Sequence, residues 1–329
     1  MLNYKILPSI IFLLFTFTAC EKAIIPKLDN NPQAIFDELW QHVDENYIYF
    51  DLKQVDWAAQ YDKYAPMISD NMTEEALFDV CATMLRELRD GHNVLVRPGR
   101  SNAYNFREGF DIHFDLNVIK TQYLNNQFEE TGFFTYGILP NNTGYVHFSK
   151  FEGARRIRRV LELMQNQNVE QLILDVRNNS GGEGAEDIIA HLIQDPTNVG
   201  YTIEKTGSGR QENSPNLSFI VQPADLYFDK PIVLLTNRGS YSATTYFAAM
   251  TKALPQVTRV GQITGGGGGG NAAYELQNGW VLKVSVSTFL DLDFVDVEPG
   301  VEPDVAVNND AAVLETGVDE MLERALEVF

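Results

Sequence analysis

Two short apolar segments constrain the fold of this 329-residue chain more than any other feature. Leu172–Val176 and Ile232–Thr236 have the length and composition of buried strands. Each precedes a polar loop and then a helical pattern, at Ala185–Gln194 and Ala243–Leu254 respectively. Strands that alternate with helices require crossover connections, which produce a largely parallel sheet. Chemistry in such folds is carried by the loops that follow the strands.

The region before this α/β pattern is predicted to be helical. Ile35, Phe36, Leu39, Trp40 and Val43 recur at helical spacing. A second helical segment starts near residue 55, and a third follows the helix-start signal at residues 73–75. We therefore expect a small helical bundle over residues 33–100.

The N-terminus has the pattern of an export signal. Lys5 precedes the apolar run Ile6–Phe17, which is too short to span a bilayer comfortably but suits a secretory signal. The run ends in Thr18-Ala19-Cys20, which resembles a bacterial lipoprotein cleavage site. We expect a signal peptide at 1–19, a tether at 20–32 and a lipid anchor on Cys20, which puts the protein in the bacterial cell envelope, on its outer-membrane or periplasmic side. The alternative is an ordinary signal peptide with a chance cysteine.

The remaining composition narrows the class of protein. A formal net charge of −20 would repel nucleic acid, whose binding needs a basic surface, so we expect no nucleic-acid partner. Cys81 is the only other cysteine and lies in an apolar helical pattern, which predicts a buried free thiol. No paired histidines or cysteine cluster with metal-ligand spacing occurs, so we expect neither metal nor cofactor.

Three loops contain residues that could carry chemistry. Ser240-Tyr241-Ser242-Ala243 lies between an apolar strand and a helix, where free N–H groups could receive an oxyanion. Arg177–Gly182 has paired glycines that allow close approach to a ligand. Asp90-Gly91-His92 places a histidine just past a helix. Taken singly, these features are more often a helix cap, a tight turn and a structural or solvated histidine, respectively.

Taken together and in this order, the three loops resemble those of the C-terminal processing, or tail-specific, serine protease family. The resemblance covers residues 33–100 and 140–307. It implies an α/β fold with a ClpP/crotonase-like core of repeated β-β-α units after the helical bundle. It also implies that Ser242 is the nucleophile and that the oxyanion donors are the N–H of Ala243 and that of Gly181 or Gly182.

The same resemblance suggests which residue acts as the base. One branch of the family uses a lysine, but the matching position here is Gly267, within six consecutive glycines. The branch that resembles the tricorn protease core uses a histidine, which matches His92, and a glutamate that orients it. Glu298 is the matching glutamate, one residue out of the usual spacing, with Asp296 and Glu302 as alternatives.

The domain plan departs from the family in one respect. Many members insert a peptide-binding PDZ module, yet only 43 residues separate Gly99 from Thr143. We therefore expect a short β linker at 101–139, with strands such as Gly109–Val118 and Gln127–Tyr136, before a catalytic core at 140–329.

The resemblance implies a serine endopeptidase or C-terminal-processing peptidase that acts on peptides or proteins in the cell envelope. The alternative is a non-catalytic lipoprotein that binds peptides or lipids on the same fold. The sequence does not indicate an oligomeric state.

The anchor can be tested directly. If Cys20 carries the lipid, Cys20→Ser should release the protein from membranes or block removal of the signal peptide, because more than one acyl chain is needed for stable anchoring. Membrane fractionation and gel mobility measure both effects. An unchanged distribution and mobility would exclude the lipid anchor.

Overall fold

The computed structural model describes residues 31–329, so Cys20 and the expected signal peptide lie outside the described residues. Among residues 31–329, no helix is both long and apolar enough to cross a bilayer. The helices longer than one turn are, in chain order, α1 (Pro32–Asn46), α2 (Phe50–Lys53), α3 (Trp57–Tyr64), α4 (Glu74–Arg86), α6 (Ile157–Asn166), α7 (Ala185–Ile189), α8 (Ala243–Met250), α9 (Ala311–Glu315) and α10 (Glu320–Val328). Short helical turns are η1 (Ala65–Met67), α5 (Leu116–Val118), η3 (Ala154–Arg156) and η4 (Thr251–Ala253), and η2 (Ile119–Tyr123) is a π-helical turn.

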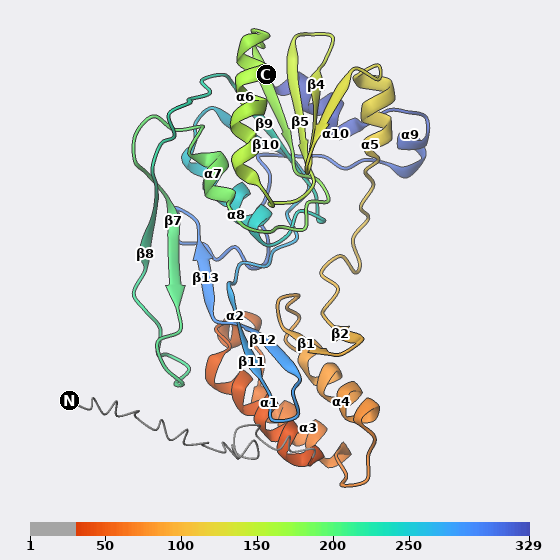
Figure 1. Ribbon diagram of the computed structural model, residues 1–329, viewed down its shortest axis with the longest axis vertical. Helices are drawn as coiled ribbons and strands as arrows, with labels where there is room; N and C mark the ends of the chain where they lie inside the picture. Colours follow the sequence, from red (N-terminus) through yellow and green to blue (C-terminus); the bar gives the residue numbers. More distant parts are fainter. Residues whose placement is uncertain (1–30) are drawn as a thin grey trace, which may run out of the picture.

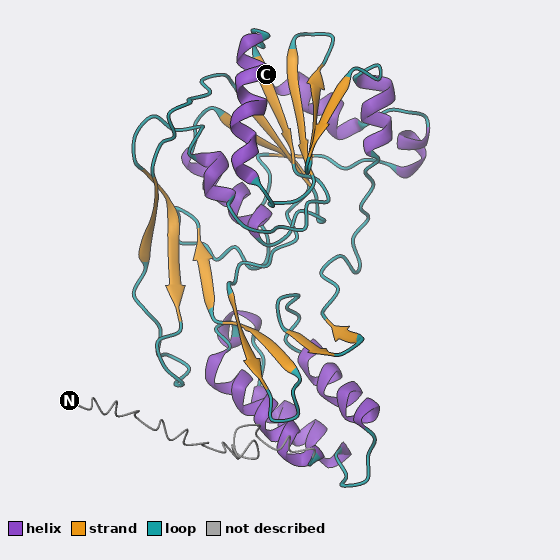
Figure 2. Ribbon diagram, in the orientation of Figure 1, coloured by secondary structure: helices purple, strands orange, loops and turns teal. Residues whose placement is uncertain are grey.

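The strands form three sheets, which Figure 2 shows in orange. A seven-stranded sheet has the order β14-β10-β9-β6-β5-β4-β3, with β14 (Val305–Ala306), β10 (Val257–Gly261), β9 (Ile232–Thr236), β6 (Gln171–Asp175), β5 (Thr143–Phe148), β4 (Phe134–Ile138) and β3 (Phe128–Thr131). A four-stranded sheet orders β11 (Asn271–Glu275), β12 (Val281–Ser285), β1 (Val94–Arg97) and β2 (Arg100–Asn102). A three-stranded sheet orders β13 (Ser287–Leu290), β7 (Thr197–Glu204) and β8 (Leu217–Val221).

The seven-stranded sheet is the middle of a three-layer core. Strands β5, β6, β9, β10 and β14 run parallel, which confirms the expected largely parallel sheet. Leu172 and Leu174 pack with α6, α7 and α8 on one face, whereas Ile173 packs with α10 on the other. Because successive strand residues point to opposite faces, these strands must be apolar throughout, as the sequence indicated. Figure 1 shows the helices on both sides of the sheet.

Most elements expected from the sequence are present. The expected strand Ile232–Thr236 coincides with β9, and Thr73 caps α4 by accepting from the Ala76 N–H at 3.2 Å. Cys81 is a buried free thiol, and burial raises its pKa to about 12. This thiol is therefore an inert part of the core.

The segment at 101–139, between the N-terminal helices and the core sheet, differs from the expected β linker. No strand forms at Gly109–Val118, where the chain is irregular before the short turn α5. Strands β3 and β4 do form near the expected Gln127–Tyr136, but they extend the core sheet, since β4 pairs antiparallel with β5. Burial of Phe134 in the core explains why these strands join the main sheet.

The N-terminal unit is not built from residues 33–100 alone. Its hydrophobic core combines α1, α3 and α4 with residues from β12 and the preceding turn, notably Trp280, Leu282 and Val284. Strand β12 pairs with β1, so residues from late in the chain complete the early unit. In Figure 1 the blue strands β11 and β12 lie against the orange helices. Helical periodicity could not reveal this pairing, because its partners lie more than 180 residues apart.

Trp280 offers a test of this arrangement. Its side chain is 2% exposed, and its ring lies edge-on to Phe78 with the ring centroids 5.3 Å apart. The indole N–H donates to Glu74 Oε1 at 3.1 Å. Trp280→Ala should lower the free energy of unfolding by about 3–5 kcal/mol, measured by denaturant titration. As a control, Val295→Ala, at a side chain that is 57% exposed, should change it by no more than about 0.5 kcal/mol. Equal effects would contradict a shared core.

Candidate active site

Ser242 lies on a strained turn between β9 and α8. Its backbone has φ 59° and ψ −125°, a conformation that non-glycine residues rarely adopt. The turn is held on both sides, since the Tyr241 N–H donates to the Asn179 carbonyl at 2.9 Å and the Ser242 N–H to the Gly266 carbonyl at 2.9 Å. These bonds fix the serine at the start of the helix.

His92 reaches Ser242 from the other unit. His92 lies in a turn that follows α4, and its backbone N–H donates to Asp90 Oδ1 at 2.8 Å. His92 Nε2 lies 2.9 Å from Ser242 Oγ, although the residues are 150 positions apart in the chain. This distance is within hydrogen-bond reach, which a base needs in order to take the proton of its nucleophile.

The surroundings of His92 favour its neutral form. Burial lowers the pKa of His92 below its ordinary value of 6.5, and the positive charges of Lys283 and Lys53 act in the same direction. The Asp90 carboxylate and the Gly269 carbonyl raise this pKa but do not overcome burial. At neutral pH the ring is therefore uncharged and can accept a proton.

Two backbone N–H groups beside Ser242 are free to bind an oxyanion. Among residues 31–329, neither the Gly182 N–H nor the Ala243 N–H has an acceptor, whereas the Gly181 N–H donates to Asn179 Oδ1 at 2.9 Å. The sequence left Gly181 and Gly182 as alternatives, and the hydrogen bonding favours Gly182. A side chain at Gly181 would lie 2.7 Å from Ser242 Cβ, so only glycine lets this loop approach.

Glu298 does not hydrogen-bond to His92. Its Oε1 forms an ion pair with Lys53 Nζ at 2.6 Å, and its Oε2 accepts from the Gly268 N–H at 2.7 Å. Among the described residues, His92 Nδ1 is buried and has no hydrogen-bond partner. The expected direct orientation of the imidazole by Glu298 is thus absent, and the carboxylate is held instead by Lys53 and the Gly268 N–H.

The pKa of Glu298 reflects this environment. Burial and the nearby Asp90 carboxylate raise it to about 8, while Lys53 and the Gly268 N–H lower it. Two carboxylates and one lysine therefore share the space behind the histidine. The lysine offsets part of the repulsion between the two acids.

The alternative residues are bound elsewhere or exposed. Asp296 accepts from Thr288 Oγ1 at 2.9 Å and from the Glu298 N–H at 2.8 Å, and burial raises its pKa to about 6. Glu302 is exposed. Lys252, which flanks the glycine run, forms an ion pair with Asp291 at 2.7 Å, and Lys283 is exposed.

The six glycines at 265–270 form a wall without side chains. Gly267 has φ +76°, and a Cβ there would lie 2.5 Å from the Tyr241 ring. A Cβ on Gly268 would lie 2.5 Å from the Glu298 backbone nitrogen. The position that holds a lysine in the other branch of the family therefore cannot hold any side chain here without moving Tyr241.

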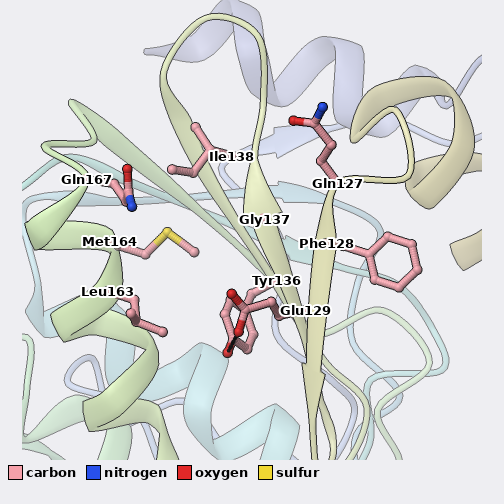
Figure 3. A pocket seen from close by; sticks show the side chains of 9 residues that line it. All are labelled: Gln127, Phe128, Glu129, Tyr136, Gly137, Ile138, Leu163, Met164 and Gln167. Atoms are coloured by element: carbon pink, nitrogen blue, oxygen red, sulfur yellow. Dashed lines mark hydrogen bonds between the residues drawn. The ribbon is translucent and has the colours of Figure 1, made fainter.

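Two hollows adjoin the serine. One, of about 980 Å³, is lined by Ser242, Gly182 and residues 150–156. The other, of about 420 Å³, has mainly apolar walls, among them Ala243, Met250 and Phe289. A third hollow, in Figure 3, lies between α6 and the strands β3 and β4, and none of its lining residues belongs to the candidate site.

Sequence reasoning missed two residues of this site. Lys53, on α2, pairs with Glu298, and no sequence signal indicates it. Tyr241 lies within the serine loop and stacks on Phe106, with the ring centroids 3.8 Å apart. Its ring centroid is 5.1 Å from that of His92, so Tyr241 packs beside the histidine. Tyr241 directly precedes the candidate nucleophile Ser242, and this position in the sequence could have indicated that it belongs to the site.

The glycine wall leads to a matched pair of variants. Gly267 and Gly99 both have φ +76°, but a Cβ at Gly99 meets nothing within 4 Å. Gly99→Ala should lower the free energy of unfolding by only about 1–2 kcal/mol, which is the cost of placing a residue with a Cβ in a left-handed backbone conformation. Gly267→Ala should cost about 1–3 kcal/mol more, because Tyr241 must move. Denaturant titration measures both losses, and equal losses would contradict a packed wall.

Comparison with known proteins agrees with this arrangement. Residues 142–307, just over half of the chain, match the model of peptidase family S41, and residues 28–86 match the tricorn protease C1 domain. Carboxyl-terminal-processing peptidase 3 of Arabidopsis thaliana chloroplasts is 30% identical over 168 residues, which cover 50% of this chain and 31% of that protein. The chain spans about a third of the length of the curated relatives it matches.

Solved structures extend the similarity to the whole fold. A candidate peptidase from Parabacteroides merdae is 32% identical, with a TM-score of 0.84 over 91% of this chain and 97% of that one. The photosystem II D1 C-terminal processing protease, at 18% identity and a TM-score of 0.56, shares the fold over 85% of this chain and 94% of its own. On the family match and these likenesses together, the chain belongs to peptidase family S41.

Proposed function

We propose that this protein is a serine peptidase that cleaves peptides or proteins through an acyl-enzyme on Ser242, with His92 as the base. One observation carries the proposal: the 2.9 Å contact between His92 Nε2 and Ser242 Oγ, next to two unpaired N–H groups. A nucleophile, a neutral base and oxyanion donors are the groups that acyl transfer requires.

The reaction follows from these groups. His92 Nε2 takes the proton from Ser242 Oγ as the oxygen attacks the substrate carbonyl. The N–H groups of Ala243 and Gly182 bind the oxyanion that forms. His92 then gives the proton to the leaving amine, and water releases the acyl group by the same steps.

Glu298 takes a supporting part in this proposal. By accepting from the Gly268 N–H, it fixes the glycine segment whose Gly269 carbonyl acts on the His92 ring. Lys53 lowers the pKa of this buried glutamate, but burial still holds that pKa at about 8. Loss of the Glu298 carboxylate should therefore disturb the position of the His92 ring more than the proton transfer itself.

Two features favour catalysis over the non-catalytic binding alternative. The backbone strain at Ser242 costs about 1–3 kcal/mol, which a simple helix cap would not need. Burial also keeps His92 neutral and in contact with the serine. A binding protein would require neither.

The substrate and the location of the protein are also proposals. The printed names of the relatives suggest C-terminal processing of proteins, and the apolar hollow beside Ala243 supports peptides with an apolar side chain near the cut. The N-terminal sequence supports export and a lipid anchor at Cys20 on the outer-membrane or periplasmic side of the cell envelope.

The catalytic roles lead to a kinetic test with a diverse peptide mixture, in which cuts are mapped by mass spectrometry. Ser242→Ala and His92→Ala should each lower kcat by about 10⁴- to 10⁶-fold, and the double variant should be little worse, because the two groups act as a unit. Glu298→Gln should cost less than either. If His92→Ala retains most of the activity while Ser242→Ala does not, another residue is the base.

The pH profile of the unmodified protein adds a control to this test. Activity should fall as pH drops through the pKa of His92, because an imidazolium cannot accept the serine proton. That pKa lies below its ordinary value of 6.5, so the acid limb should lie below this pH. A lysine base would instead lose activity from a much higher pH.

A further inference from the structure

The proposed mechanism gives His92 a positive charge in the transition state, and a negative group must face it to stabilise it. Glu298 was the expected group, but it is held by Lys53 and the Gly268 N–H and makes no hydrogen bond to His92. Among the described residues, His92 Nδ1 has no hydrogen-bond partner. The question is therefore which carboxylate acts on the ring.

Asp90 is held close to the histidine by several hydrogen bonds. It is 1% exposed, and its Oδ1 accepts from the His92 backbone N–H at 2.8 Å. Its Oδ2 accepts from Ser285 Oγ at 2.8 Å and from Asn93 Nδ2 at 3.3 Å. Asn93 Oδ1 in turn accepts from the Ser285 N–H at 3.0 Å. The turn that carries His92 is thus fastened to β12 through Asp90 and Asn93.

Asp90 and Glu298 differ in their charged partners. No ion pair with a lysine or arginine is formed by Asp90 among the described residues, whereas Glu298 is paired with Lys53. The charge of Asp90 is therefore free to act on its neighbours, and that of Glu298 is largely offset.

The other charged and titratable groups near the ring come from four elements or loops. Lys53 lies on α2, Lys283 on β12, Glu298 before β14, and Tyr241 before α8. Both lysines disfavour a charged imidazole, and Tyr241 is neutral because burial raises its pKa far above its ordinary value. Of the acids in this group, Asp90 has the largest effect in favour of the imidazolium.

We propose that Asp90, rather than Glu298, is the positioning residue that fixes the turn bearing His92 and supplies a negative charge near its imidazolium. This inference rests on the proposed function. The serine proton moves from Ser242 Oγ to His92 Nε2 and on to the leaving amine. The proton passes only between Ser242, His92 and the leaving amine, and Asp90 acts through its position and charge.

Three isosteric or near-isosteric variants separate charge from anchoring. Asp90→Asn removes the charge, Ser285→Ala keeps the charge but removes one hydrogen bond, and Glu298→Gln neutralises the competing carboxylate. Asp90→Asn should lower kcat about 10- to 100-fold with little change in KM, since a charge-assisted contact to the transition state is lost. Ser285→Ala and Glu298→Gln should each lose less than about 10-fold. Thermal unfolding shows whether each variant is folded.

The second readout does not depend on activity. In a Ser242→Ala background, NMR titration of the His92 ring measures its pKa directly. Adding Asp90→Asn should lower the pKa of His92 by about one, because an opposing charge is lost, whereas adding Glu298→Gln or Ser285→Ala should change it little. Acid limbs of the kcat profiles in the Ser242-containing proteins should move in the same order.

The outcomes are distinguishable. A larger drop in the His92 pKa for Glu298→Gln than for Asp90→Asn, or no drop for Asp90→Asn, would overturn the inference even in an active enzyme. Should the protein cleave no peptide, the proposed function fails, and the NMR titration still decides whether Asp90 acts on the ring.

Discussion

The hydrogen bond between Ser242 and His92 depends on the joining of two units of the chain. Ser242 belongs to the parallel-sheet core, and His92 follows the last helix of the N-terminal unit. Strand β12 links the two units. It pairs with β1, packs into the N-terminal core and ends at Ser285. Ser285 binds Asp90, two residues before His92. The site can form only when both units are folded together.

The glycine run makes the close approach of these parts possible. It passes between the Ser242 turn, Glu298 and the N-terminal unit, where a Cβ on Gly269 would lie 2.8 Å from the Tyr49 ring. Backbone amides and carbonyls take the place of side chains there, binding Ser242, Glu298 and β13. A segment that must contact so many neighbours at backbone distance has no room for a lysine, and this favours a base that comes from elsewhere.

Local patterns were enough to predict the elements that position the nucleophile and the histidine. The apolar strands before residues 177 and 237 and the loops that follow them needed only nearby sequence to recognise. Long-range features escaped prediction. The pairing of β1 with β12 and the three-stranded sheet of β13, β7 and β8 depend on contacts between distant segments. The pairing of Glu298 with Lys53 depends on how α2 meets the core, which no local pattern encodes.

The central claim is that Ser242 is a nucleophile activated by His92. Intact-protein mass spectrometry after exposure to a fluorophosphonate probe, followed by peptide mapping, tests it most directly because it detects the covalent bond itself. We expect one adduct, on Ser242, formed at least about 100-fold more slowly in His92→Ala because the serine then lacks its base. An adduct on another residue, or labelling of Ser242 at an unchanged rate without His92, would contradict it.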